Sequence, residues 1–208
     1  MLLLPLACRG ALTLLLSSPF ATSSWADSPR AVPMLTYDVI VHDQSIGQFN
    51  VRKTPTPTGI QYRGDADVAI QFFGEKHMVT HFTSTYHNNV LTEASFNDQL
   101  NGRTKHDALV RWDGRGYCVW VNEASSIIGN RPATYSTASL YDHEPKGVNE
   151  LFSERYERFC TLRPVAAHTY ELNLPDGKKN YYRYTDGICH EIEVQQPLFT
   201  IFFRLRHA

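Results

Sequence analysis

The chain has 208 residues, with 20 Lys and Arg against 21 Asp and Glu, and aromatic residues make up 12% of it. That length favours a single domain whose core needs neither a metal nor a crosslink to form. The charges are balanced and form no basic stripe, which argues against nucleic acid and anionic membrane surfaces as partners. Abundant aromatic residues suit half-buried strands and favour a β fold.

Residues 1–26 have the pattern of a secretory signal peptide. Two short apolar runs, Leu2–Leu4 and Ala11–Leu16, precede Ser24 and Ala26 at the minus-three and minus-one positions of a cleavage site. The apolar stretch is too short and too interrupted to cross about 30 Å of hydrocarbon. We therefore expect an exported protein, periplasmic or secreted, that is cleaved after residue 26 and has no transmembrane span in its mature chain.

Three cysteines follow the leader: Cys118, Cys160 and Cys189. An oxidising compartment would allow one disulfide, and the pair Cys160–Cys189 is the nearer in sequence. The alternative is that all three are small core residues. None has C-x-x-C spacing, so the sequence gives no sign of redox catalysis.

After a linker at 27–33, apolar and polar residues alternate with a period of two, which is typical of half-buried strands. The alternation predicts twelve strands at 35–42, 46–53, 60–73, 77–87, 90–100, 103–112, 117–122, 158–165, 168–174, 178–185, 188–195 and 198–205. Asn101-Gly102 is a strong hairpin signal, because a type I′ turn needs positive φ at both central residues. Gly64 is the candidate position for a bulge in the third strand.

The alternation stops at 125–157, where Gly and Pro residues interrupt it. Tyr135–Tyr141 has the pattern of a short helix, and Asn149 could cap a second helical turn that runs through Phe152. We therefore predict a mostly β fold in one domain at 34–206. It is an antiparallel meander that forms an open or partly closed barrel, and the helical and loop insertion covers its mouth or its concave face.

Histidines are the first candidates for chemistry. His77 and His81 have the spacing of helical zinc ligands, but in a strand they lie roughly 13 Å apart, too far to share one ion. His87 falls on the same face, whereas His106 falls on the face of Ala108 and Val110. We expect ordinary surface or hydrogen-bonded histidines, no metal and no cofactor.

Carboxylates and a serine are the second candidates. Asp142, His143, Glu144 and Ser153 lie in the insertion, but no G-x-S-x-G elbow accompanies them. Turn and capping roles are the plainer interpretation.

Glu191 and Glu193 share a strand face with Cys189 and Gln195. Paired carboxylates can act as acid and base. A solvated outer face is the plainer interpretation here too, and we lean away from an enzyme.

Four stretches carry a resemblance to a known family: Tyr37–Asp43 with Ile46–Gly47, Ser139–Pro145, Asn149–Glu154 and Leu174–Gly177. In these the chain resembles the exported bacterial proteins grouped as domain of unknown function 6134, over most of the mature chain. That family has no established activity, so the resemblance implies no catalytic residues. More loosely, the architecture is similar to the unclosed barrels of periplasmic lipoprotein carriers, a likeness of fold that implies no function.

Many strands, abundant aromatics and a single insertion suggest a concave apolar surface. The first hypothesis is a binding protein for a lipid or another hydrophobic small molecule. Its candidate ligand-binding residues are Phe72, Phe82, Tyr86, Phe96, Trp112, Trp120, Tyr141 and Phe152, with Tyr182 and Phe202 on alternating positions as well. The alternatives are an envelope interaction protein with a packed interior and a hydrolase with its site at 125–157. The sequence leaves the oligomeric state open.

Overall fold

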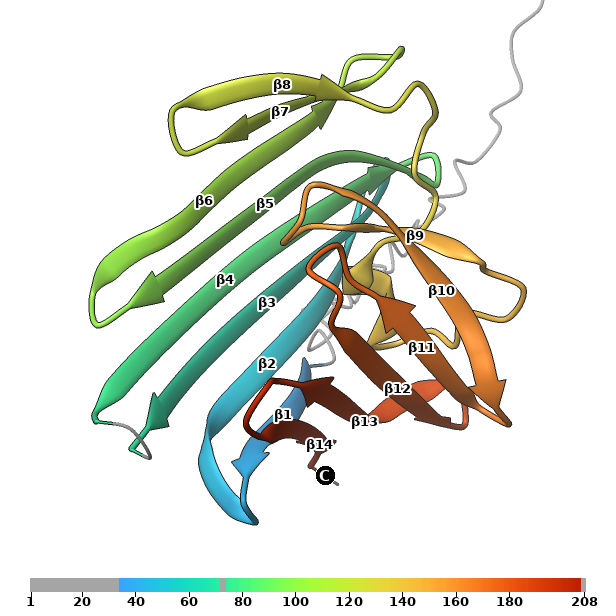
Figure 1. The fold of residues 1–208 in the computed structure, drawn as a ribbon. Coiled ribbons are helices and arrows are strands. Elements are labelled where there is room, and N and C mark those ends of the chain that lie inside the picture. Colours follow the sequence, from blue (N-terminus) through green and yellow to red (C-terminus); the bar gives the residue numbers. More distant parts are fainter. Residues whose placement is uncertain (1–33, 72–73, 207–208) are drawn as a thin grey trace, which may run out of the picture. The chain divides into compact units, whose positions relative to one another are not determined.

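The computed structural model describes residues 34–71 and 74–206 (Figure 1). All of these residues belong to one compact unit. The expected signal peptide at 1–26, the linker at 27–33 and Phe72 lie outside the described residues. Among the described residues, no helix is long and apolar enough to cross a membrane.

The described residues form one sheet of fourteen strands and one short 3₁₀ helix, η1 (Thr137–Leu140). The strands are β1 (Met34–Val41), β2 (Gln44–Thr56), β3 (Gly59–Ile70), β4 (Lys76–His87), β5 (Val90–Leu100), β6 (Arg103–Trp112), β7 (Tyr117–Val121), β8 (Ala124–Ile128), β9 (Glu150–Ser153), β10 (Arg158–Ala166), β11 (Thr169–Asn173), β12 (Lys179–Thr185), β13 (Ile188–Gln195) and β14 (Thr200–Leu205).

The sheet is an open antiparallel meander. Strands that follow each other pair with each other from β1 to β8 and from β9 to β14, and β1 also pairs with β14. The two ends of the meander therefore meet in the middle of the sheet, and β8 and β9 are its edges. The predicted fold class and all twelve predicted strands are confirmed.

Tight hairpins explain why neighbours in sequence are neighbours in the sheet. Asn101 and Gly102 have φ values of 51° and 72°, as a type I′ turn requires. Asn88 and Asn89 repeat the arrangement with 49° and 62°. Asparagine tolerates the left-handed region better than other non-glycine residues, so both turns suit the twist of the strands they join.

The insertion differs from the prediction. Its ends are strands: β8 continues the ladder of β7, and β9 continues that of β10. The expected helical turn after Asn149 is wrong, because Leu151 and Phe152 in β9 are both fully buried and pair with β10. A strand buried on both faces shows no alternation, so its sequence signal was lost. The first helical prediction survives only as the four residues of η1.

Residues 129–149, which we name the crossing segment, connect β8 to β9 across the concave side of the sheet. Its main chain bonds to three separate strands. The carbonyl of Ala133 accepts from the Leu91 amide at 2.8 Å, that of Tyr135 from Phe152 at 2.9 Å, and that of Tyr141 from Cys189 at 3.1 Å. These bonds tie both halves of the sheet to one loop.

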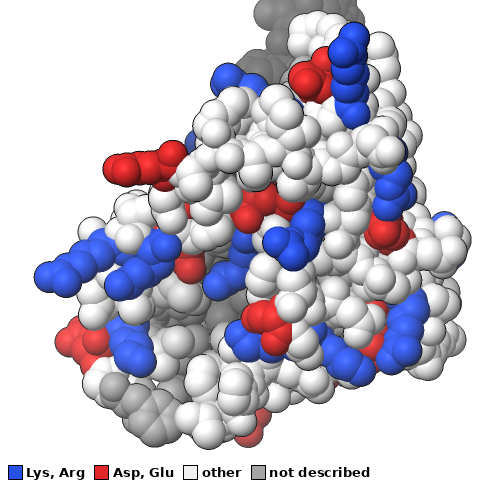
Figure 2. Space-filling model, turned by 45° about the horizontal axis from the view of Figure 1, so that its top comes forward, with Lys and Arg blue, Asp and Glu red and all other residues white. Residues whose placement is uncertain are grey.

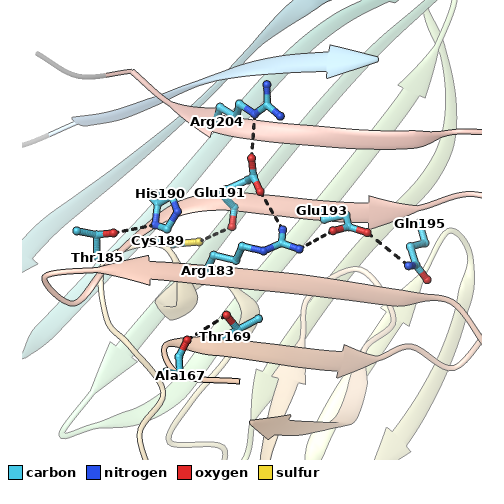
Figure 3. Close-up of polar contacts among 10 residues, drawn as sticks. All are labelled: Ala167, Thr169, Arg183, Thr185, Cys189, His190, Glu191, Glu193, Gln195 and Arg204. Carbon is cyan, nitrogen blue, oxygen red and sulfur yellow. Dashed lines mark hydrogen bonds and ion pairs between the residues drawn. The ribbon is translucent and has the colours of Figure 1, made fainter. Parts of the chain in front are cut away.

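The outer face of β12–β14 carries a network of charges (Figure 3). Arg183 binds Glu191 at 2.9 Å and Glu193 at 2.7 Å, and Arg204 reaches Glu191 at 2.8 Å. The expected solvated face is therefore present. However, a bulge at His190 shifts the register, so the prediction that Cys189 shares this face is wrong. Cys189 pairs with Tyr184, and both are buried on the inner face.

Candidate functional site

The bent sheet surrounds a partly open cavity of about 400 Å³. One wall comes from β1–β5 and the other from β11–β14, which face each other across the interior (Figure 1). Apolar side chains of the two walls include Val39, Phe49, Val68, Phe82 and Phe96 on the first and Leu172, Tyr182, Ile192, Ile201 and Phe203 on the second. This volume lies within the range of roughly 300–1,000 Å³ that is typical of small-molecule sites.

The crossing segment closes one part of the cavity through Thr137 and Tyr141. The ring of Tyr141 stacks on Phe82 at 6.1 Å and lies 5.2 Å from Phe49. Beyond it, towards β7 and β9, Phe152 packs 5.1 Å from Tyr117. The interior is thus filled by the insertion in one half of the sheet and hollow in the other.

Glu154, which follows β9, is 2% exposed and lines the cavity. Its carboxyl group accepts from Ser84 at 2.5 Å, from the Thr137 hydroxyl, and from the Ala138 amide at 3.3 Å. These three donors lie on β4 and η1. Glu154 therefore anchors η1 to the opposite wall, and its oxygen atoms are already occupied.

The cations that line the cavity are partly exposed and paired. Arg155 lies 3.8 Å from Asp98, and Lys178 lies 3.0 Å from Asp176. Basic and acidic side chains are interspersed over the face in Figure 2, with no extended area of one sign. The walls are otherwise mainly apolar, so the cavity can desolvate an aliphatic chain but does not by itself select an anion.

The predicted ligand-binding residues divide into those that line the cavity, those that belong to the core or pack against it, and Trp120, which does neither. Phe82, Phe96 and Tyr141 line the cavity, as does Tyr182. Tyr86, Phe152 and Trp112 belong to or pack against the hydrophobic core and are not among the lining residues.

Trp120 differs from the prediction. It is 40% exposed and lies on the face of β7 opposite the buried Tyr117 and Val119, so it contributes to neither core nor cavity. The sequence alternates correctly in this strand, but parity alone does not say which face is concave.

Sequence reasoning missed much of the β13–β14 wall. Ile192, Val194, Phe199, Ile201 and Phe203 line the cavity, whereas Phe202, which was singled out, has its ring against Arg204. The apolar residues in the sequences of these two strands were the signal that could have identified this wall. The bulge at His190 obscured it in β13 by changing which alternate residues point inward.

Three of the four candidate histidines are paired with carboxylates. His77 lies 2.7 Å from Asp67 and His81 lies 2.6 Å from Asp65, both on the exposed face. His106 lies 2.6 Å from Glu157. The part of the chain that the structure describes contains no group of three His, Cys, Asp or Glu side chains that could hold a metal ion.

The four residues considered for hydrolysis have separate environments. Asp142 pairs with Lys53 at 2.7 Å, His143 is exposed, and Ser153 is buried in the cavity wall. Glu144 accepts from Tyr170 at 3.0 Å. Within residues 34–71 and 74–206, no hydrogen bond joins a serine, a histidine and a carboxylate of this set into a triad.

Cys118, Cys160 and Cys189 are free thiols. The disulfide that the sequence allowed, Cys160–Cys189, is absent, and the alternative, small core residues, describes both of them because both are buried. Burial raises the pKa of Cys160 to about 11 and that of Cys189 to about 12. A thiol reacts as its thiolate, so these two are chemically inert in the folded protein.

Comparisons with known proteins agree with the fold. The crystal structure of a beta-barrel-like protein of the domain of unknown function DUF1849, from Brucella abortus, superposes with a TM-score of 0.53. The match covers 84% of this chain and 96% of that one at 10% identity, so the likeness is one of fold alone. A search of curated proteins found no significant match. The sequence of residues 37–206 matches the family described as Domain of unknown function (DUF6134), and the chain belongs to that family.

Proposed function

We propose that this protein binds an apolar small molecule, with an acyl chain as the best-fitting class, in the cavity between β1–β5 and β11–β14. The observation that carries the proposal is the cavity of about 400 Å³ that remains while the crossing segment is in place. Close-packed interiors leave few voids larger than a water molecule, so a cavity of this size is a feature to be explained.

The energetics favour an aliphatic ligand. Burial of each methylene contributes about 0.8 kcal/mol, so a chain of modest length gains enough to offset the cost of immobilisation. The walls offer aromatic and branched aliphatic side chains on both sides, as such a chain requires. A packed interior, which would suit a purely structural protein, describes only the half of the sheet near Phe152.

The test uses the fluorescent apolar probe 1-N-phenylnaphthylamine and native mass spectrometry of protein extracted gently from its own cells. We expect saturable fluorescence that decanol displaces, and a co-purifying small molecule in the mass spectrum. Val68→Phe, in the cavity wall, should weaken probe binding, because the larger ring fills the space. Ala69→Phe is the matched control, since the neighbouring residue is exposed.

A wild-type protein that gives no saturable signal and carries no small molecule would refute the binding proposal. Equal probe binding by Val68→Phe and wild type would also refute the binding proposal, provided that Val68→Phe and Ala69→Phe both keep a cooperative thermal transition.

We propose further that the protein acts outside the cytoplasm, on the strength of the signal-peptide pattern at 1–26. The intact mass of protein recovered from the cell envelope or the medium should correspond to a chain that starts at Asp27. Soluble cytoplasmic protein that keeps Met1 would contradict export.

A further inference from the structure

Three polar residues of the cavity wall have hydrogen-bonding capacity that the described residues leave unused. Asn180 Oδ1 is buried and accepts no hydrogen bond. Within the described part of the chain, the Tyr141 hydroxyl makes no hydrogen bond. The Tyr182 oxygen receives a hydrogen bond from the Asn180 side chain, which lowers the pKa of Tyr182 against the larger effect of burial, but the Tyr182 O–H has no acceptor among these residues. Tyr182 is only 4% exposed. All three residues line the cavity. Buried polar groups are normally paired, so one unused acceptor and two unused O–H donors in a single cavity need an explanation.

Other buried tyrosines show how the fold usually treats this group. Five of them donate their O–H to a neighbour: Tyr37 to the Cys189 carbonyl at 2.8 Å, Tyr86 to Ser136 at 2.8 Å, Tyr117 to the Leu91 carbonyl at 2.9 Å, Tyr170 to Glu144 at 3.0 Å and Tyr184 to the Leu140 carbonyl at 2.8 Å. The sixth, Tyr62, has the Asp142 carboxylate as its partner. A buried tyrosine usually finds a partner for its O–H. Tyr141 and Tyr182 depart from that pattern, and both face the cavity.

The three groups converge. Asn180 and Tyr182 are two residues apart on the inner face of β12, about 6.6 Å along the strand. Tyr141 reaches the same region from the crossing segment. Burial raises the pKa of Tyr141, and the neighbouring Tyr182 is the next cause. Two donors and one acceptor therefore meet in one desolvated place.

We propose that the cavity selects an aliphatic molecule with a neutral head group that both accepts and donates a hydrogen bond, as a hydroxyl does. The head group accepts from Tyr141 and Tyr182 and donates to Asn180 Oδ1, while the aliphatic chain lies between the two walls. This inference rests on the proposed function and names the ligand class for the same cavity.

The surrounding charges favour a neutral head group over an anion. Burial raises the pKa of Tyr182 most, and a hydrogen bond from Asn180 lowers it. The titratable groups that act on this pKa are Cys189, Glu154 and Cys160, and no cation is among them. The cations Arg155 and Lys178 are partly exposed and already face Asp98 and Asp176. A carboxylate placed beside Tyr182 would lose its hydration without gaining a counter-ion.

The test measures displacement of 1-N-phenylnaphthylamine by decanol, decane and decanoate, above about pH 7 where decanoate is ionised. Wild type should prefer decanol to both others. Tyr182→Phe and Tyr141→Phe should each weaken decanol binding by about threefold to tenfold and leave decane unchanged. Tyr156→Phe is the matched control, because Tyr156 lines the cavity but its hydroxyl already donates to Asp176 at 2.9 Å.

The outcomes separate the two proposals. Equal affinity for decanol and decane, or unchanged decanol binding in both tyrosine variants, would overturn this inference while leaving hydrophobic binding intact. A preference for decanoate that disappears in Arg155→Gln or Lys178→Gln would also overturn it, in favour of an anionic ligand. If the probe does not bind wild type at all, the proposed function fails and this inference fails with it.

Discussion

At the scale of single residues, Gly64 shows how the sheet makes room for its cavity. The register of β3 with β4 is continuous here, so the bulge anticipated at this glycine is absent. Gly64 pairs with Phe82, and a Cβ on Gly64 would lie 2.0 Å from the Phe82 ring. The glycine is therefore required because the aromatic ring of its cross-strand partner lies over it.

Gly64→Ala should destabilise the protein by about 1–3 kcal/mol, because the Phe82 ring must move into the cavity and against Tyr141. Chemical denaturation followed by circular dichroism measures the loss. Phe82→Leu combined with Gly64→Ala removes the clash, so the double variant should lose less stability than the two single losses added together. Simple additivity would show that the ring and the new methyl group do not compete.

The same scale shows where sequence reasoning stops. Alternation put Phe82 and Phe96 among the candidate residues, and both line the cavity. Alternation also put Trp120 among the candidates, because nothing in a single strand distinguishes its concave face from its convex one. Bulges are the second limit, since a single extra residue at His190 reverses the face of every residue before it in β13.

At the scale of elements, the strands with turn chemistry were predictable and the crossing segment was not. Twelve strands are bounded by Gly, Asn or Pro turns or by regular alternation, and those signals are local. β8 is short and exposed, and β9 is short and buried, so neither alternates. Their strand state depends on ladder bonds to β7 and β10, which a local pattern does not contain.

Glu154 explains why the crossing segment holds a defined position. The sequence placed this residue in a family motif without a role. The structure makes it the common acceptor for Ser84, Thr137 and the Ala138 amide, which brings η1 onto β4. The residues that these contacts join to Glu154 are between 16 and 70 positions away from it in the sequence. No spacing within the insertion could have indicated them.

At the scale of the whole molecule, the burial of tyrosine side chains makes the stability of the fold depend on pH in the alkaline range. The pKa of all eleven tyrosines is raised, with burial as the largest cause for each. The unfolded chain releases these protons near pH 10, before the folded chain does. The folded state then binds more protons than the unfolded state, so the free energy of unfolding decreases as pH rises above about 10.

We therefore expect a delayed, cooperative alkaline titration. Phenolate absorbance of the native protein should lag behind that of the same protein in guanidinium chloride, then rise steeply together with loss of the β-sheet circular dichroism signal. The steepness follows because the most buried tyrosines, such as Tyr37 and Tyr184, ionise only when the sheet opens. A native titration curve that overlays the denatured one while circular dichroism stays unchanged would mean that these hydroxyl groups reach water in the folded protein, which would contradict their burial.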